Sequence, residues 1–171
     1  MKFKRFLEAE EGLVVYCDLD GVLTDLRGGV SELTNEPLNT DNQAMRALVL
    51  LRRNNPQVFA DGKFWEDLNW TPHGREIWNA IQPYDPVILT GAVSGVEADV
   101  GKQKWVEREL GLPANRIIFS TTKHEYARPN AVLIDDTQRN IDNWEQHDGI
   151  GILHSDANYQ NTLMKLQALS S

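Results

Sequence analysis

Short apolar runs recur along the chain, and segments with a helical pattern separate most of them. The runs are rich in Val, Ile or Leu and lack polar alternation; they cover residues 13–17, 87–89, 117–119, 131–134 and 150–153. Continuous apolar runs of this length are typical of strands that are buried on both faces of a parallel sheet. We therefore predict five strands.

Helical patterns follow the second, fourth and fifth runs. We predict helices over residues 94–110, 138–146 and 156–169. In the first of these, Ser94 and Glu97 have the spacing of a capping box. The same helix ends at a glycine, which is a common helix stop, with a proline just beyond it. Strands that alternate with helices predict a doubly wound α/β fold around a parallel sheet.

The segment between the first two strands is too long for a single crossover helix. We predict that residues 25–84 form a small, mainly helical cap, inserted after the first strand into a core of residues 1–24 and 85–171. The alternative is a longer ordinary crossover that contains a loop.

Two helices are expected within this insertion. One covers residues 41–54 and places Met45, Leu48 and Val49 on one face. The other covers residues 71–81, beginning with a threonine as its cap and a proline in its first turn. These patterns favour the cap over a simple loop.

Composition and charge limit the possible partners of the chain. Hydrophobic residues make up 41% of it, which is ordinary for a globular protein, and its formal net charge is −8. An acidic protein repels the nucleic-acid backbone, so we do not expect long nucleic acid as a partner. A single cysteine allows no internal disulfide, and no stretch approaches the roughly 18 apolar residues of a membrane span. The first eleven residues lack the apolar core of a signal peptide, so we expect a soluble cytoplasmic protein with no membrane partner.

Carboxylates follow two of the predicted strands. Asp18 and Asp20 come directly after the first strand, and Asp135 and Asp136 come directly after the fourth. Ligands of open α/β sheets bind beyond the carboxyl ends of the strands, so we expect these four side chains to face one crevice. Crowded carboxylates repel one another without a cation, and carboxylate oxygens are ligands that suit Mg²⁺. The pattern therefore predicts a magnesium site.

A hydroxyl and an ammonium group are expected at the same edge. Thr90 ends the second strand and is followed by Gly91, and Lys123 lies just beyond the third strand. Such groups can hold phosphate oxygens while a carboxylate attacks phosphorus. Taken singly, Thr90 could simply cap a helix and Lys123 could be any surface lysine. Their order at successive strand ends is what favours phosphoryl transfer.

Three further residues are candidates for contacts with a substrate. Phe64 and Trp65 lie in the predicted cap, where they could stack on a leaving group or pack the cap's own core. Lys102 lies near the start of a predicted helix and could face the cleft as a second cation, although a solvated lysine is the interpretation we favour.

The motifs at the strand ends resemble those of the haloacid dehalogenase superfamily. The stretch from Asp18 to Asp25 resembles its first motif, residues 88–91 its second, Lys123 its third and residues 133–136 its fourth. Within the superfamily, the chain is most similar to the 5′(3′)-deoxyribonucleotidases and related phage and bacterial proteins.

This resemblance implies a role for each motif residue. Asp18 would become phosphorylated, and Asp20 would protonate the leaving alkoxide and then activate water. Asp18, the backbone carbonyl of Asp20 and one of Asp135 or Asp136 would hold Mg²⁺. The phosphate would be bound by Thr90 and Lys123.

The chain departs from the nucleotidase pattern at three positions. Leu26 stands where an aromatic residue is usual, Thr121 stands where an arginine is usual, and Gly91 takes the place of a serine. These departures concern the residues that would read the base. They bear on the nucleotide substrate and leave the predicted reaction unchanged.

We therefore expect a Mg²⁺-dependent phosphomonoester hydrolase that acts on a small phosphorylated substrate such as a (deoxy)nucleoside monophosphate. The alternatives are a 3′-end polynucleotide phosphatase and an inactive metal-binding regulatory module on the same fold. A dehalogenase is disfavoured, because Asp20 suits the acid–base chemistry of phosphate esters. The pattern does not predict an oligomeric state.

Overall fold

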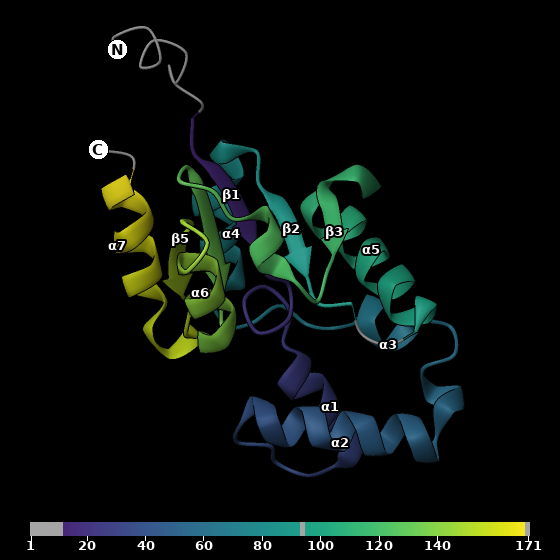
Figure 1. The fold of residues 1–171 in the computed structure, drawn as a ribbon. Helices are drawn as coiled ribbons and strands as arrows, with labels where there is room; N and C mark the ends of the chain where they lie inside the picture. The colour runs from purple at the N-terminus through teal and green to yellow at the C-terminus, as the bar shows by residue number, and fades with distance from the viewer. Residues whose placement is uncertain (1–11, 93–94, 170–171) are drawn as a thin grey trace, which may run out of the picture.

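The computed structural model describes residues 12–92 and 95–169, in which a parallel sheet forms the centre of the molecule (Figure 1). The strands are β1 (Val14–Cys17), β2 (Val87–Thr90), β3 (Ile117–Phe119), β4 (Ala131–Asp135) and β5 (Ile150–Leu153). Neighbouring strands are parallel, in the order β3-β2-β1-β4-β5. The predicted doubly wound α/β fold is therefore confirmed, with β1 at the centre of the sheet.

Helices lie between most of these strands, and one more follows the last strand. They are α1 (Leu26–Thr34), α2 (Asp41–Asn54), α3 (Lys63–Glu66), α4 (Gly74–Ile81), α5 (Val96–Leu110), α6 (Gln138–Glu145) and α7 (Tyr159–Leu169). Short 3₁₀ turns complete the connections, among them η4 (Lys123–Tyr126), which follows β3. Within the described part of the chain, none of the helices is both long enough and apolar enough to cross a membrane.

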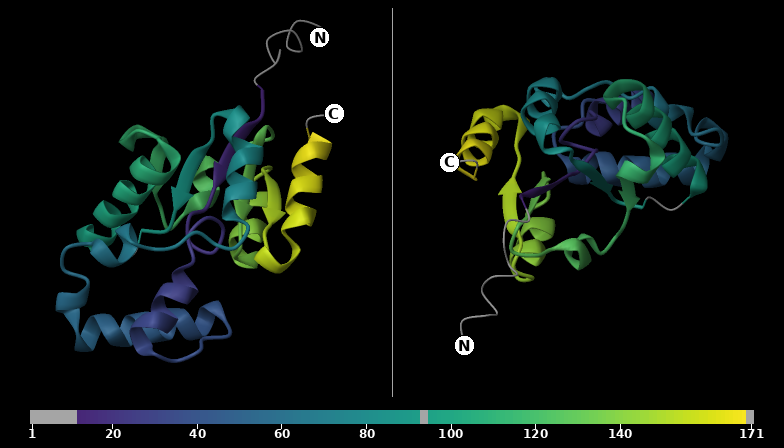
Figure 2. Two further views of the ribbon diagram at one scale, coloured as in Figure 1. Left: turned by 180° about the vertical axis from the view of Figure 1, so that it is seen from behind. Right: turned by 90° about the horizontal axis from the view of Figure 1, so that it is seen from above.

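The sheet is covered on both faces (Figure 2). On one face, Val15 and Cys17 of β1 belong to a buried cluster with side chains of α4, α5 and α7. On the other face, Tyr16 belongs to a second cluster that includes Trp144 of α6. Successive side chains of a strand point to opposite faces, so a strand with helices on both sides is apolar at every position. This burial explains the continuous apolar runs.

A cap lies beyond the carboxyl ends of the strands (Figure 1). Its helices α1, α2 and α3 share a separate buried cluster, which also takes in Ala98 of α5. The two segments that join cap and core run side by side, because Thr24 pairs in antiparallel fashion with Trp70. Two backbone hydrogen bonds of 2.8 Å flank this pair. The cap is therefore joined to the core by a short two-stranded connection.

The cap also rests directly on α5. Gly62, which precedes α3, and Gly101 of α5 approach so closely that a Cβ on Gly101 would lie 2.1 Å from the Gly62 carbonyl oxygen. Gly62 has a φ of 73°, which favours glycine as well. The indole of Trp105 donates a 2.8 Å hydrogen bond to the carbonyl oxygen of Leu68. These contacts hold α3 against α5.

The structure corrects several expectations about the insertion. Helix α4 packs on the sheet, so only the part of residues 25–84 that precedes it forms the cap cluster. Met45 and Val49 of α2 are 43% and 62% exposed, because the buried face of this helix is built around Leu48. Helix α4 starts later than expected, because the hydroxyl of Thr71 donates to a carbonyl oxygen of the β1–α1 loop instead of capping the helix.

Helix α5 begins at Val96, with Gly95 as its cap residue. Ser94 lies outside the described residues, so its predicted capping box is not part of this description. The end of α5 agrees with the expectation, since Gly111 adopts the left-handed conformation that follows many helices.

Candidate active site

The loop after β1 holds two of the candidate carboxylates. The backbone N–H of Leu19 donates to Asp18 Oδ1 at 2.8 Å, and the hydroxyl of Thr24 donates to Asp20 Oδ1 at 3.0 Å. Gly21 has a φ of 81°, and a Cβ on it would lie 2.0 Å from an oxygen of Asp136. The positive φ favours glycine here, and the absence of a Cβ leaves room for the carboxylate from β4.

Lys123 links the acidic ends of β1 and β4. Its ammonium nitrogen lies 2.9 Å from Asp18 Oδ1 and 2.6 Å from Asp135 Oδ2, and the side chain is almost fully buried. Burial lowers the pKa of Lys123, but the two carboxylates outweigh it and raise the pKa above its ordinary value. Lys123 is therefore a fixed positive charge between the two strands.

Asp135 is completely buried and fully hydrogen-bonded. Besides Lys123, it accepts a 2.8 Å bond from the backbone N–H of Thr137 and 3.0 Å bonds from the amide of Asn140. Sequence reasoning missed Asn140. Its signal was its place in the first turn of the helix that follows the acidic pair, which brings an amide back to the strand end.

Lys102 is buried, which corrects the interpretation that it is a solvated lysine. Its ammonium nitrogen lies 2.7 Å from Asp20 Oδ2, and it donates 3.1 Å hydrogen bonds to Thr90 Oγ1 and to the carbonyl oxygen of Gly91. A charge at 1% exposure needs such partners to offset its lost hydration. A sequence signal existed, since Lys102 lies three positions before the core residue Trp105 and so shares its helix face.

Thr90 is also fully buried, and its hydroxyl bonds to Lys102. Gly91 lines the cleft that contains Asp18, whereas Thr90 does not. The predicted phosphate contact of Thr90 therefore has only indirect support here, through the lysine that it helps to hold.

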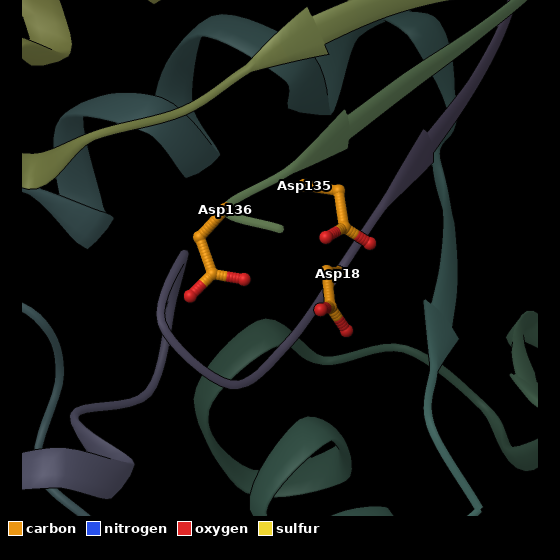
Figure 3. Close-up of side chains that lie close together, drawn as sticks. All are labelled: Asp18, Asp135 and Asp136. Atoms are coloured by element: carbon orange, nitrogen blue, oxygen red, sulfur yellow. The ribbon is translucent and has the colours of Figure 1, made fainter. Parts of the chain in front are cut away.

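Three carboxylates converge at the ends of β1 and β4 (Figure 3). Ligand oxygens of Asp18, Asp135 and Asp136 lie within 4.8 Å of one another. Burial raises the pKa of Asp18 to about 7, against the opposing effect of Lys123. Burial, followed by Asp18, Asp135 and Asp41, raises the pKa of Asp136 to about 8. Mutual repulsion among buried carboxylates is what a bound cation relieves, so this set of oxygen donors fits Mg²⁺.

A cleft of about 700 Å³ opens above these groups and contains Asp18, Asp20, Lys102, Lys123 and Asp136 in its lining. Its cap side is mixed, with the aliphatic side chains of Leu26, Leu38 and Met45 beside the charged side chains of Asp25, Arg27 and Asp41. Its core side includes the segment after β5, with His154 and Asp156. The cleft therefore lies between the cap and the carboxyl edge of the sheet.

Phe64 and Trp65 do not line this cleft, which corrects their predicted role in stacking on a leaving group. Trp65 is 1% exposed inside the cap cluster, and Phe64 packs edge-on against it at a ring separation of 5.2 Å. Phe64 instead lines a separate 360 Å³ pocket on the cap. Both rings serve the core of the cap, where large aromatic side chains bury the most area.

Comparison with solved structures agrees with the fold. A haloacid dehalogenase-like hydrolase from Streptococcus pneumoniae matches with a TM-score of 0.52 and 11% identity, over 94% of this chain and 99% of that one. A predicted phosphatase from Clostridium acetobutylicum matches with a TM-score of 0.50 and 14% identity, over 88% and 90% of the two chains. No family model and no curated protein sequence matches this chain. At these identities the likeness concerns the α/β architecture.

Proposed function

We propose that this protein is a magnesium-dependent phosphomonoester hydrolase that uses Asp18 as a covalent nucleophile. The observation that carries this proposal is the arrangement around Asp18. Within one cleft, Lys123 bridges Asp18 to Asp135, Asp136 approaches from the same edge, and a second buried lysine holds Asp20. Nucleophile, acid–base group, cation donors and positive charges are then together, as phosphoryl transfer requires.

Asp136 is the better candidate for direct contact with the metal. Both oxygens of Asp135 already accept hydrogen bonds from Lys123, Thr137 or Asn140, so its role is to orient the lysine. Among the residues that the structure describes, Asp136 accepts only a 3.3 Å bond from the neighbouring Thr137 hydroxyl, and it lines the cleft. Asp18, the carbonyl oxygen of Asp20 and Asp136 would hold Mg²⁺, which when bound neutralises the charge between carboxylate and phosphate.

In this mechanism Asp18 forms and loses the bond to phosphorus, and Asp20 transfers the protons. A carboxylate oxygen of Asp18 attacks phosphorus, the phosphorus–ester bond breaks, and the leaving oxygen takes a proton from Asp20. In the second half, Asp20 accepts a proton from the water that attacks the phosphoaspartate, which releases phosphate and restores Asp18. Lys102 and Thr24 hold the two oxygens of Asp20 for both transfers.

The substrate is proposed to be small. A (deoxy)nucleoside monophosphate is the candidate that the sequence resemblance supplies, but the cleft offers it no stacking by Phe64 or Trp65. A polynucleotide end is disfavoured by the net charge of −8. An inactive metal-binding module would have no use for a side-chain acid held by a buried lysine.

The test is hydrolysis of an aryl phosphate by the purified chain. We expect phosphate release that requires Mg²⁺, stops with EDTA and resumes when Mg²⁺ is restored. Asp18→Asn should abolish turnover, whereas Asp142→Asn, on the exposed surface of α6, should retain it. Activity in the Asp18 variant would contradict covalent catalysis, and Mg²⁺ binding without any turnover by the unmodified chain would favour the regulatory module.

A further inference from the structure

The cleft carries more negative charge than the proposed reaction uses. Its lining contains the carboxylates of Asp18, Asp20, Asp25, Asp41, Asp136 and Asp156, and the cations Arg27, Lys102 and Lys123. The two lysines are committed to Asp18, Asp20 and the buried Asp135. Mg²⁺ and a phosphate dianion would cancel each other. In the rest of the lining, as far as the structure describes it, three carboxylates (Asp25, Asp41 and Asp156) stand against a single cation, Arg27, so this part of the cleft keeps a surplus of negative charge.

Asp41 is the clearest part of this surplus. It lies in the first turn of α2, on the cap, and its charge contributes to the raised pKa of Asp136 on the opposite side of the cleft. Among the described residues, its carboxylate has no hydrogen-bond or ion-pair partner. Asp41 and Asp136 line the same cleft, so the alcohol part of a phosphate ester held next to Asp136 would lie in the space that the Asp41 carboxylate borders.

The rest of the cleft wall is aliphatic and polar. No phenylalanine, tyrosine or tryptophan lines it among the described residues, so a nucleobase would find none of these large rings to stack on. Leu38 and Met45 offer contact to methylene groups. His154 lines the cleft at 2% exposure, and its Nε2 has no hydrogen-bond partner in the described part of the chain. That nitrogen is itself buried, so the polar contacts of the leaving alcohol are left to the carboxylates of the lining.

We propose that the substrate is a phosphomonoester of a short amino alcohol. Its ammonium group is bound by the carboxylates that line the cleft outside the reaction centre, with Asp41 as its main partner. This inference rests on the proposed phosphatase function and narrows its substrate class. An ammonium close to a carboxylate is attracted by charge and by a charge-assisted hydrogen bond. A neutral alcohol gains neither, and a carboxylate-bearing alcohol is repelled.

The test compares three two-carbon esters of similar size whose end groups differ in charge: phosphoethanolamine, 2-hydroxyethyl phosphate and phosphoglycolate. We expect kcat/KM to be about tenfold higher for phosphoethanolamine than for the hydroxyl ester, and lowest for phosphoglycolate. The preference should shrink as KCl is raised, because salt screens exposed charges. Equal kcat/KM for the first two esters, or a higher value for deoxyuridine monophosphate, would overturn the inference.

Variants identify the residue responsible. In Asp41→Asn the ratio of kcat/KM between the ammonium and hydroxyl esters should fall about fivefold. In Glu36→Gln, which removes the same charge from an exposed cap loop outside the cleft lining, the ratio should stay as it is. An equal fall in both variants would overturn the role of Asp41. If the protein does not hydrolyse even an aryl phosphate, the phosphatase proposal fails as well. If it hydrolyses an aryl phosphate but has the same kcat/KM for all three esters, only the amino-alcohol inference fails.

Discussion

Replacing Asp18 by Asn should make the metal-free protein more stable while it abolishes turnover. The pKa of Asp18 rises from 3.8 to about 7, chiefly because of burial, so the ionised carboxylate destabilises the folded state. Three pKa units correspond to about 4 kcal/mol at most. Because Asp136 titrates together with Asp18, part of that energy belongs to the pair, and we expect about 2 kcal/mol for the single substitution.

The amide keeps the favourable contacts of the carboxylate. Its oxygen can still accept hydrogen bonds from the Leu19 N–H and from Lys123, and Asp135 still neutralises that lysine. A gain of about 2 kcal/mol should raise Tm by roughly 4–8 °C in a chain of this size. Asp142→Asn is the control on the exposed surface of α6, and we expect it to leave Tm within about 1 °C.

The pH dependence gives a second measurement. A carboxyl group whose pKa is raised on folding binds more protons in the folded state, so stability is lost as the pH rises from the unfolded to the folded pKa. For Asp18 this window runs from 3.8 to about 7. In thermal unfolding with EDTA, the advantage of Asp18→Asn at pH 5.5 should be about half its value at pH 8.

Mg²⁺ should narrow the difference at pH 8, because it stabilises the unmodified protein more than a variant that lacks one of its ligands. A lower Tm for Asp18→Asn than for the unmodified protein at pH 8 in EDTA would refute the reasoning. It would mean that Asp18 contributes more through its bond to Lys123 than it loses through burial.

Two further substitutions test the helix that follows β2. Lys102→Met should lower kcat on an aryl phosphate by about 10²-fold or more, because Asp20 loses the ammonium that holds it. The control, Lys104→Met on the exposed face of α5, should change kcat little. Similar losses of kcat in both variants would contradict the role of Lys102. Gly101→Ala should lower stability by about 2 kcal/mol, measured by urea unfolding, because its methyl group would meet the Gly62 carbonyl; an unchanged midpoint would argue against the close packing of cap and core.

The strands could be predicted from the sequence because burial on both faces makes each of them a continuous apolar run. Each strand has helices or turns on both faces, so its apolar run is uninterrupted and its ends lie within a residue of the prediction. The acidic residues at the ends of β1 and β4 followed from the same reasoning, since parallel strands place their carboxyl ends at one edge.

The cap was harder to predict, because tertiary contacts override local preference there. Helix α1 contains Gly28 and Gly29, which disfavour a helix, and it is stabilised instead by the cap of Asp25 and the burial of Val30. The orientation of Trp65 depends on how a four-residue helix packs against α5, which no local period encodes. The aromatic residues could therefore be placed in the cap but not on its correct side.

The close contact at Gly101 has a consequence for the chemistry, because the next residue in the chain is Lys102. Two consecutive residues of α5 therefore make two different contacts: Gly101 packs against the cap, and Lys102 pairs with Asp20. In the proposed mechanism, a shift of the cap along α5 would displace the proposed proton donor and also reshape the substrate cleft. Recognition of the alcohol and protonation of its oxygen would then be coupled through α5, and we expect changes in the cap to alter both kcat and KM.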